Sequence, residues 1–486
     1  MSETTQSTPT PSKGNGAVSI FTMSMITVAA VLALRNLPSL ADYGWAVVFY
    51  LVAACLFFFI PSALVSAELA STYPENGGVY QWVKQAFGPR WGFVAIFMQW
   101  VDNLPWFPAA LTFVASAIAY VFDPALATNK WFVFSVIMVT LWASTLLNFR
   151  GIKLSAFLSS SGVIAGTIIP GIIIILMVAI YLILGDKDQI PFAWDKMVPS
   201  LGNFNQLMLF AGMMISLSGM EMSAVHVTEM KNPTVSFPKA IFMATIIIVV
   251  LSIAGSLAIA IVVPPATLSF AAGVPQAFND VFKALHLGWL TPILCFLLAY
   301  GAVTMVVTWV LGPSKGLLEV AKEGYLPKLW QKRNRNDIPT NILLIQACLS
   351  SLLSTVVLFM PNISSAFWMM SALSAQLYMV MYLLMFAAAI RLRYTQPNIK
   401  RPYHIPGGKL GMWIVSGIAW LTSLVSIFFG FIPPSNVPQG FLGTTGMAAQ
   451  AIYVIILVGL VVGLTAMPLT FYHFYEKKKR EEQAHS

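Results

Sequence analysis

The feature that most constrains this chain is a series of uncharged apolar runs, each long enough to cross a lipid bilayer. A transmembrane helix needs about 20 consecutive apolar residues, and such runs recur along the 486 residues. Only 9% of the residues are charged and the mean hydropathy is +0.78, whereas a soluble domain carries about 25% charged residues. The sequence therefore predicts an all-α membrane protein that crosses the bilayer many times.

Taken in order, the apolar runs predict twelve spans after a polar, disordered N-terminus at 1–16. No small-residue cleavage site follows the first run, which is typical of an uncleaved first span. The longer connections are a basic, helix-compatible loop at 312–340 and a loop at 264–287 with an amphipathic stretch. A short tail is expected at 473–486. The spans are placed at 17–37, 46–67, 91–121, 131–149, 161–184, 205–228, 239–263, 288–311, 341–360, 366–390, 411–432 and 448–472.

The basic residues cluster in alternate connections between these spans. Short loops rich in Lys and Arg stay on the cytoplasmic side of a membrane, so the pattern predicts an even number of spans with both termini in the cytoplasm. The net charge of +9 is then a topology signal, and nucleic acid is excluded as a partner. Of the 27 bases, those that fall outside this pattern are Arg35, Lys130, Lys187, Lys196 and Lys283.

Motifs for enzymatic chemistry are absent from the sequence. It contains no GxxxxGK[ST], HExxH or GxSxG motif, so neither an ATP-driven pump nor a hydrolase is predicted. Cys55, Cys295 and Cys348 lie singly within apolar runs, which indicates small core residues rather than a disulfide framework or a zinc site. We expect no metal and no organic cofactor.

Polar groups interrupt the sixth predicted span. The stretch SGMEMSAVHV places Ser218, Gly219, Glu221 and His226 after an uncharged run. An ionisable group at mid-membrane costs about 2.5–3.5 kcal/mol on insertion scales, so Glu221 requires a compensating partner. In secondary transporters, broken helices leave free backbone groups at the midplane that bind a carboxylate and an ammonium. The alternative is that Ser218 and Gly219 form a packing contact and Glu221 an inter-helix hydrogen bond.

Several segments together resemble the amino acid–polyamine–organocation transporter superfamily, and within it the glutamate:GABA antiporter branch. They are SLSGMEMSAVHVTEMKNP (216–233), AELASTYPENGGVYQWVKQAFGPRWGF (67–93), WVLGPSKGLLEVAKEGYLP (309–327), and RPYHIPGGK (401–409) followed by FIPPSN (431–436). The resemblance implies a LeuT-like fold of two inverted five-helix repeats plus two C-terminal helices, with broken first and sixth helices. The repeats would occupy 17–184 and 205–390, with the last two helices at 411–472.

The resemblance also has departures. Many members break the first span at glycines, whereas the corresponding stretch AAVLALRNLP, with the candidate substrate-binding residues Ala30, Ala33 and Arg35, has none. The branch's glutamate antiporter has an acidic residue four positions before the tryptophan that corresponds to Trp309, where this chain has Met305. Glutamate:GABA exchange itself is therefore placed below other amino acid/amine pairs.

The third and eighth spans supply further candidates. Asp102, in FMQWVDNLPWFPA, either pairs with a substrate ammonium, or pairs with Arg35 or caps a proline kink. Trp106 and Trp309 are candidate aromatic walls, because cations and aliphatic chains stack on indole. The alternative for each is ordinary core packing.

The remaining candidates lie on four different spans. Tyr378 and Tyr382 share a helix face at spacing i, i+4; they either line the transport path, as the resemblance implies, or form a packed pair. Arg35 either attracts a carboxylate or extends to the interface. Glu68 and His226 are candidates for gating or pH sensing, against structural roles.

We interpret the chain as a secondary antiporter of the inner membrane. It would exchange an amino acid for its decarboxylated amine by alternating access, in acid resistance or amine production, as a monomer or homodimer in the lipid bilayer. A proton-coupled or facilitative permease is the main alternative. An ion channel and a transporter-like sensor rank lower, because neither a filter motif nor a soluble output domain is evident.

Overall fold

The computed structural model describes residues 18–74, 77–150, 161–185, 188–198, 213–214, 216–224, 226–227, 230–432, 440–441 and 444–484. Within these ranges the chain is almost entirely helical. The first helices are α1 (Ile20–Val31), α2 (Leu37–Ala41), α3 (Val47–Ala54), α4 (Ile60–Thr72), α5 (Val79–Phe87), α6 (Pro89–Val101), α7 (Asn103–Phe122), α8 (Lys130–Asn148) and α10 (Ile169–Ile183).

The second half of the chain continues this helical pattern. Two very short antiparallel strands, β1 (Gly440–Phe441) and β2 (Thr444–Thr445), precede the last helix. The helices are α12 (Met220–Ala224), α13 (Pro233–Val262), α14 (Gly273–Ala284), α15 (Leu290–Lys322), α16 (Thr340–Ser354), α17 (Val356–Phe359), α18 (Ile363–Thr395), α19 (Gly408–Gly430) and α20 (Gly446–Ala484).

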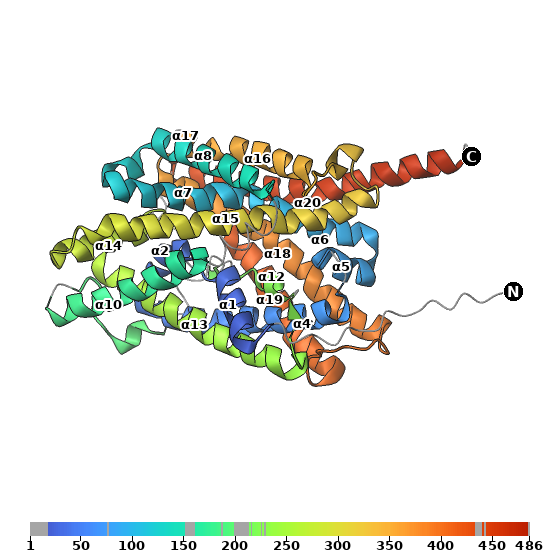
Figure 1. Ribbon diagram of the computed structural model, residues 1–486, viewed down its shortest axis with the longest axis horizontal. Helices are drawn as coiled ribbons and strands as arrows, with labels where there is room; N and C mark the ends of the chain where they lie inside the picture. Colours follow the sequence, from blue (N-terminus) through green and yellow to red (C-terminus); the bar gives the residue numbers. More distant parts are fainter. Residues whose placement is uncertain are drawn as a thin grey trace.

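The helices form one bundle whose long elements run along the horizontal axis of Figure 1. In the described residues, ten continuous helical runs are long and apolar enough to cross a membrane, and a bent pair near the N-terminus makes an eleventh. An all-α, multi-pass membrane protein is thus confirmed. Eleven of the 24 residues of the sixth predicted span, 205–228, lie outside the described residues, so the count of twelve and the two inverted repeats stay predictions.

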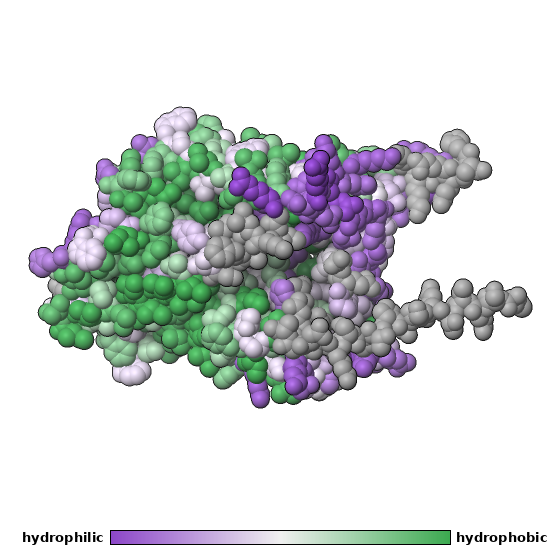
Figure 2. Space-filling model, in the orientation of Figure 1, coloured by the Kyte–Doolittle hydropathy of each residue, from purple (hydrophilic) through white to green (hydrophobic). Residues whose placement is uncertain are grey.

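The two ends of the bundle differ in polarity. Hydrophilic side chains gather at the right-hand end in Figure 2, where Figure 1 places α5 and the C-terminal end of α15. Hydrophobic side chains cover much of the rest of the visible surface, as expected for a surface in contact with lipid. We call the end with α5, the C-terminal ends of α15 and α18, and the segment 400–409 the basic end.

The first predicted span, 17–37, is broken even though it contains no glycine. Helix α1 ends at Val31, and a 3-10 turn η1 (Leu34–Asn36) leads into α2 with a bend of 44°. The connecting residues Leu32 and Ala33 have φ/ψ of −74°/108° and −122°/114°. Both lie in the broad extended region that any L-residue adopts, so this break does not require glycine.

The third span runs from Pro89 to Phe122 and is among the most enclosed in the bundle. It consists of α6 and α7, joined at Asp102, which retains helical dihedrals. Pro105 and Pro108 lack the N–H groups that would bond to the carbonyls one turn earlier. Together with α15 and α18, which pack against it, this span forms the centre of the bundle.

One expectation about the connections is corrected and one is confirmed, and one expectation about the cysteines is corrected. The loop expected from residue 312 begins only after Lys322, because Leu317, Val320 and other apolar residues of α15 are buried and extend the helix. The amphipathic stretch in 264–287 forms α14. Cys348 is exposed rather than in the core, on the outer face of α16, whereas Cys55 and Cys295 are buried.

Candidate substrate site

The break in the sixth span depends on one glycine. Ser218 and Gly219 are non-helical and α12 begins directly after them. Gly219 has φ +106°, a conformation that side chains rarely adopt, and a Cβ atom there would lie 3.1 Å from the Ala30 carbonyl oxygen and 3.3 Å from Trp309 Cζ2. The breaks in the first and sixth spans therefore face each other, with the Trp309 ring against Gly219.

Glu221 is the second residue of α12, directly after this break, and several donors surround its carboxylate. Tyr378 Oη donates to Oε1, Tyr382 Oη donates to Oε2 at 2.6 Å, and Gln99 Nε2 donates to Oε1 at 3.1 Å. Tyr382 Oη also accepts from the Gly219 N–H at 2.9 Å. Glu221 is buried, and these donors offset the desolvation of a carboxylate at membrane depth. It is thus an inter-helix bridge from α12 to α18 and α6.

An aromatic layer lies beside this network. The Trp106 and Trp309 ring centroids are 5.6 Å apart, and Trp309 lies 6.3 Å from Tyr378 in a T-shaped contact. Phe58, in the π-helical turn η3 (Cys55–Phe59), contacts the Tyr382 ring edge-on at 5.1 Å. The predicted aromatic candidates are therefore brought together into one continuous layer across α7, α15 and α18.

Asp102 is buried close to this layer but does not pair with Arg35. Asn103 Nδ2 lies 3.4 Å from its Oδ1, and the Ser374 side chain of α18 is a hydrogen-bond partner. Glu221 is near enough to interact with it electrostatically. Two carboxyl groups on different helices therefore face the same central region.

Arg35 follows the break in the first span and is buried instead of extending to the interface. Its guanidinium carbon lies 4.7 Å from the centroid of the Trp106 ring, and 8% of the residue is exposed. The ion pairs found among the described residues do not include Arg35. Its Nε atom has no hydrogen-bond partner in that part of the chain.

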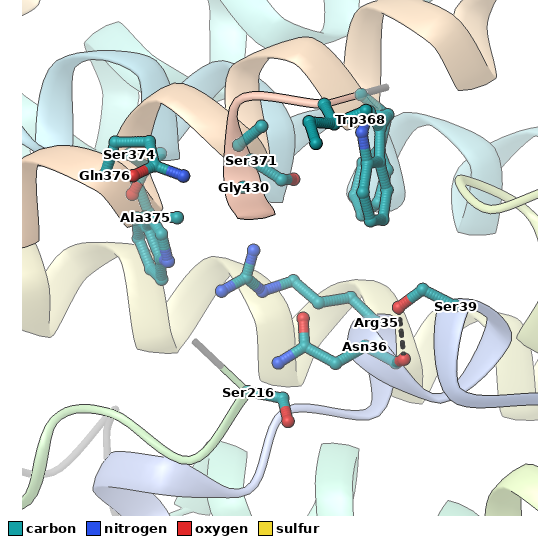
Figure 3. A pocket seen from close by; sticks show the side chains of 14 residues that line it. Arg35, Asn36, Ser39, Ser216, Trp368, Ser371, Ser374, Ala375, Gln376 and Gly430 are labelled. Carbon is teal, nitrogen blue, oxygen red and sulfur yellow. Dashed lines mark hydrogen bonds between the residues drawn. The ribbon is translucent and has the colours of Figure 1, made fainter. Parts of the chain in front are cut away.

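Two cavities lie on opposite sides of the central groups. The larger, of about 360 Å³, is lined by Gln99, Glu221, Met222, Lys315 and Glu319, among others, and opens toward the basic end. We call it the basic-end cavity. The smaller, of about 50 Å³, includes Arg35, Trp106, Ser216 and residues of α18 in its lining. Figure 3 shows the Arg35 side chain extending into this opposite-end cavity, toward Ser371 and Gln376.

Glu68 and His226 lie away from the two cavities. Glu68 is buried at the basic end, where Arg393 donates to both carboxylate oxygens at 2.7 and 2.6 Å and the Ile405 N–H donates to Oε2 at 2.7 Å. Arg401 Nε lies 3.3 Å from Oε1. Glu68 thus ties α4 to the end of α18. The backbone N–H of His226 donates to the Ser223 carbonyl in the turn after α12.

The structure adds residues that the sequence analysis did not select. Gln99 and Ser374 contact the two central acids, Gln376 and Ser371 line the opposite-end cavity, and Lys315 lines the basic-end cavity. The available signal was polarity within an apolar span. Gln99 stands three residues before Asp102, and the tenth span carries the run SALSAQ.

Two broken helices that face each other, a buried acid beside one of the breaks and a cavity on either side of the central groups are features of a membrane transporter. The family model for amino acid permeases matches residues 18–461. The chain therefore belongs to the amino acid permease family of the amino acid–polyamine–organocation superfamily, and to its branch with the glutamate/γ-aminobutyrate antiporters. It is a transporter and not an enzyme.

Three relatives illustrate what the chain is similar to. An uncharacterized transporter of Legionella pneumophila is 42% identical over 424 residues, covering 87% of this chain and 90% of the relative. A glutamate/γ-aminobutyrate antiporter of Lactococcus lactis is 32% identical over 466 residues, covering 95% of this chain and 91% of the relative. A probable agmatine/putrescine antiporter of the same species is 22% identical over 421 residues, covering 86% of this chain and 89% of the relative.

Proposed function

We propose that this transporter exchanges an amino acid for its decarboxylated amine across the cytoplasmic membrane. The observation that carries this proposal is the position of Glu221. It is hydrogen-bonded to Tyr378 and Tyr382 directly beside the break at Gly219, and it lines the basic-end cavity. A substrate bound between the two breaks would meet the carbonyls left free at the end of α1 and the N–H groups at the start of α12. These groups suit an ammonium and a carboxylate respectively.

The two cavities support alternating access. The basic-end cavity reaches Glu221, whereas the opposite-end cavity stops at Trp106 and Ser374. Between them lies the aromatic layer of Trp106, Trp309 and Tyr378. With the basic end in the cytoplasm, as the positive-inside rule favours, both termini are cytoplasmic and this is a conformation open to the cytoplasm. Movement of α12 against α18 would close one cavity and open the other.

The substrate pair is suggested by chemistry and by the relatives together. Asp102 and Glu221 supply carboxylates for an ammonium, and the indoles of Trp106 and Trp309 stack on cations and aliphatic chains alike. Relatives are named for glutamate/γ-aminobutyrate and for agmatine/putrescine exchange. Exchange of an amino acid for the product of its decarboxylation removes acid from the cell, since decarboxylation consumes a cytoplasmic proton. This places the transporter in acid resistance or amine production.

Counterflow in proteoliposomes tests the exchange mode. Purified protein is reconstituted into liposomes that contain either an amino acid or the amine formed by its decarboxylation. The labelled partner compound is added outside, and its uptake is followed. We expect uptake only when the interior holds an amino acid or amine of the accepted class. Equal uptake into empty liposomes without a proton gradient would point to facilitated transport. Uptake that requires only a proton gradient would point to proton coupling.

A further inference from the structure

The cavity on the side away from the basic end contains a buried cation that has no counter-ion among the described residues. Arg35 is 8% exposed, and among the described residues it makes no ion pair and its Nε atom has no hydrogen-bond partner. Its contact to the face of Trp106 at 4.7 Å stabilises a guanidinium by about 0.5–2 kcal/mol. Desolvating an ion costs several kcal/mol. The contact with Trp106 alone therefore leaves much of the cost of burying this charge uncompensated.

The neighbouring side chains supply further donors for an anion. Ser371 Oγ is buried without a hydrogen-bond partner among the described residues, and the Gln376 amide, which lines the same cavity, carries two N–H donors on Nε2. Both residues line the same cavity as Arg35 and lie around its guanidinium in Figure 3. The space of about 50 Å³ holds roughly four waters at 10–15 Å³ each. A carboxylate group with one or two attached carbon atoms is of about this volume.

The cavity also adjoins the central site. Ser371, Ser374, Tyr378 and Tyr382 recur at helical spacing on one face of α18. The stretch from the first of these residues to the last is about 16 Å long at 1.5 Å per residue. Ser374 lines the cavity and contacts Asp102, while Tyr378 and Tyr382 bind Glu221. A molecule with a carboxylate and an ammonium could therefore contact Arg35 with one end while its other end points toward Asp102.

We propose that Arg35, Ser371 and Gln376 form an anion subsite that binds the carboxylate of a substrate entering from the side opposite the basic end. Arg35 is the charged partner, held in position by the indole of Trp106. The inference rests on the proposed transport function and adds a substrate requirement, since molecules taken up through this side carry a carboxylate. Amines that lack a carboxylate do not contact this subsite.

Binding measurements on purified protein test this directly. Thermal stabilisation is followed with the amino acids and γ-aminobutyrate as carboxylates, and with putrescine and agmatine as carboxylate-free amines. Arg35→Met preserves much of the length of the side chain and removes its charge. Arg35→Lys keeps the charge but cannot form the two parallel hydrogen bonds that a guanidinium makes to a carboxylate. Lys283→Gln is the matched control, because Lys283 is an exposed base on α14 and does not line the cavity.

We expect Arg35→Met to weaken binding of carboxylates about 10- to 100-fold, as for loss of a hydrogen bond to a charged group. Arg35→Lys should retain part of the affinity, and putrescine or agmatine binding should change less than twofold. In right-side-out liposomes the KM for external carboxylates should rise by the same factor. Lys283→Gln should match the unsubstituted protein in every assay.

Three outcomes would overturn the subsite. They are carboxylate binding that does not depend on Arg35, equal losses for carboxylates and carboxylate-free amines, and Arg35-dependent stabilisation by chloride but by no carboxylate. Failure of counterflow in the unsubstituted protein would instead refute the exchange function. Arg35-dependent carboxylate binding can still be measured in that case, so the two failures are distinguishable.

Discussion

The hydrogen bonds that surround Glu221 make a quantitative prediction about the conformational equilibrium. They join α12 to α18 and α6 in a conformation whose larger cavity opens at the basic end. Glu221→Gln retains the shape of the side chain but replaces one acceptor oxygen with an NH2 donor. Tyr378 and Gln99 both donate to the same oxygen, so an NH2 group there would face two donors. An NH2 group at the other position would remove the acceptor for Tyr382.

The magnitude follows from the loss of at least one hydrogen bond to a charged group. Such a bond contributes about 1.5–3 kcal/mol, and every 1.4 kcal/mol is a factor of ten. If the network exists only in the conformation open to the basic end, Glu221→Gln shifts the population toward the opposite conformation by about 10- to 100-fold. Substrate affinity should change less than the rate of exchange.

Accessibility to a membrane-impermeant thiol reagent measures this shift. Single cysteines replace Met222, which lines the basic-end cavity, or Ser216, which lines the opposite one. The background has Cys55, Cys295 and Cys348 replaced by alanine. Glu221→Gln should slow labelling at position 222 from the basic side and speed labelling at position 216 from the other side. Unchanged labelling at both positions, with slower exchange, would refute the bridge as a conformational determinant.

Three further substitutions test other parts of the site. Asp102→Asn should weaken amine binding more than amino acid binding, by about 1.5–3 kcal/mol, in thermal-shift titrations; equal losses would favour a structural role. Gly219→Val should abolish substrate binding in a protein that is still monodisperse in detergent, because φ +106° and the contact to the Ala30 carbonyl leave no room for a side chain; normal binding would place the substrate elsewhere. Glu68→Ala should lower the free energy of unfolding by about 3–5 kcal/mol, because it leaves the largely enclosed guanidinium groups of Arg393 and Arg401 without this counter-ion; an unchanged melting temperature would contradict this.

Most of the membrane topology was predictable because it depends on composition over long windows. A span of about 20 apolar residues tolerates errors of a few positions, and every predicted span outside 205–228 corresponds to a helical segment that the structure describes. The residues at which individual helices end were less predictable. Helix α15 continues to Lys322 because the apolar face after Pro313 packs against neighbouring helices, and that packing depends on partners far away in the sequence.

The two helix breaks show where local sequence is informative and where it is not. Gly219 was selected as a break residue, and its φ of +106° is one that glycine adopts readily. The break at Leu32 and Ala33 uses ordinary extended dihedrals, so no residue type marks it. Its cause is tertiary: α2 packs against α13 and α14, which fixes the direction in which the chain continues after α1.

The partners of the buried ionisable groups could not be predicted from sequence for the same reason. Tyr378 and Tyr382 were expected to share a face, since that follows from helical spacing, but their common acceptor Glu221 is 157 and 161 residues away. The sequence allows Asp102 and Arg35 to form an ion pair, and an apolar medium favours the pairing of opposite charges. In the structure Asp102 instead contacts Asn103 and Ser374, and Arg35 lies against Trp106. Keeping a buried cation and a buried acid apart is costly in a fold that only has to be stable. The separation is understandable in a transporter, because each charge stays available to the end of a substrate that it can bind.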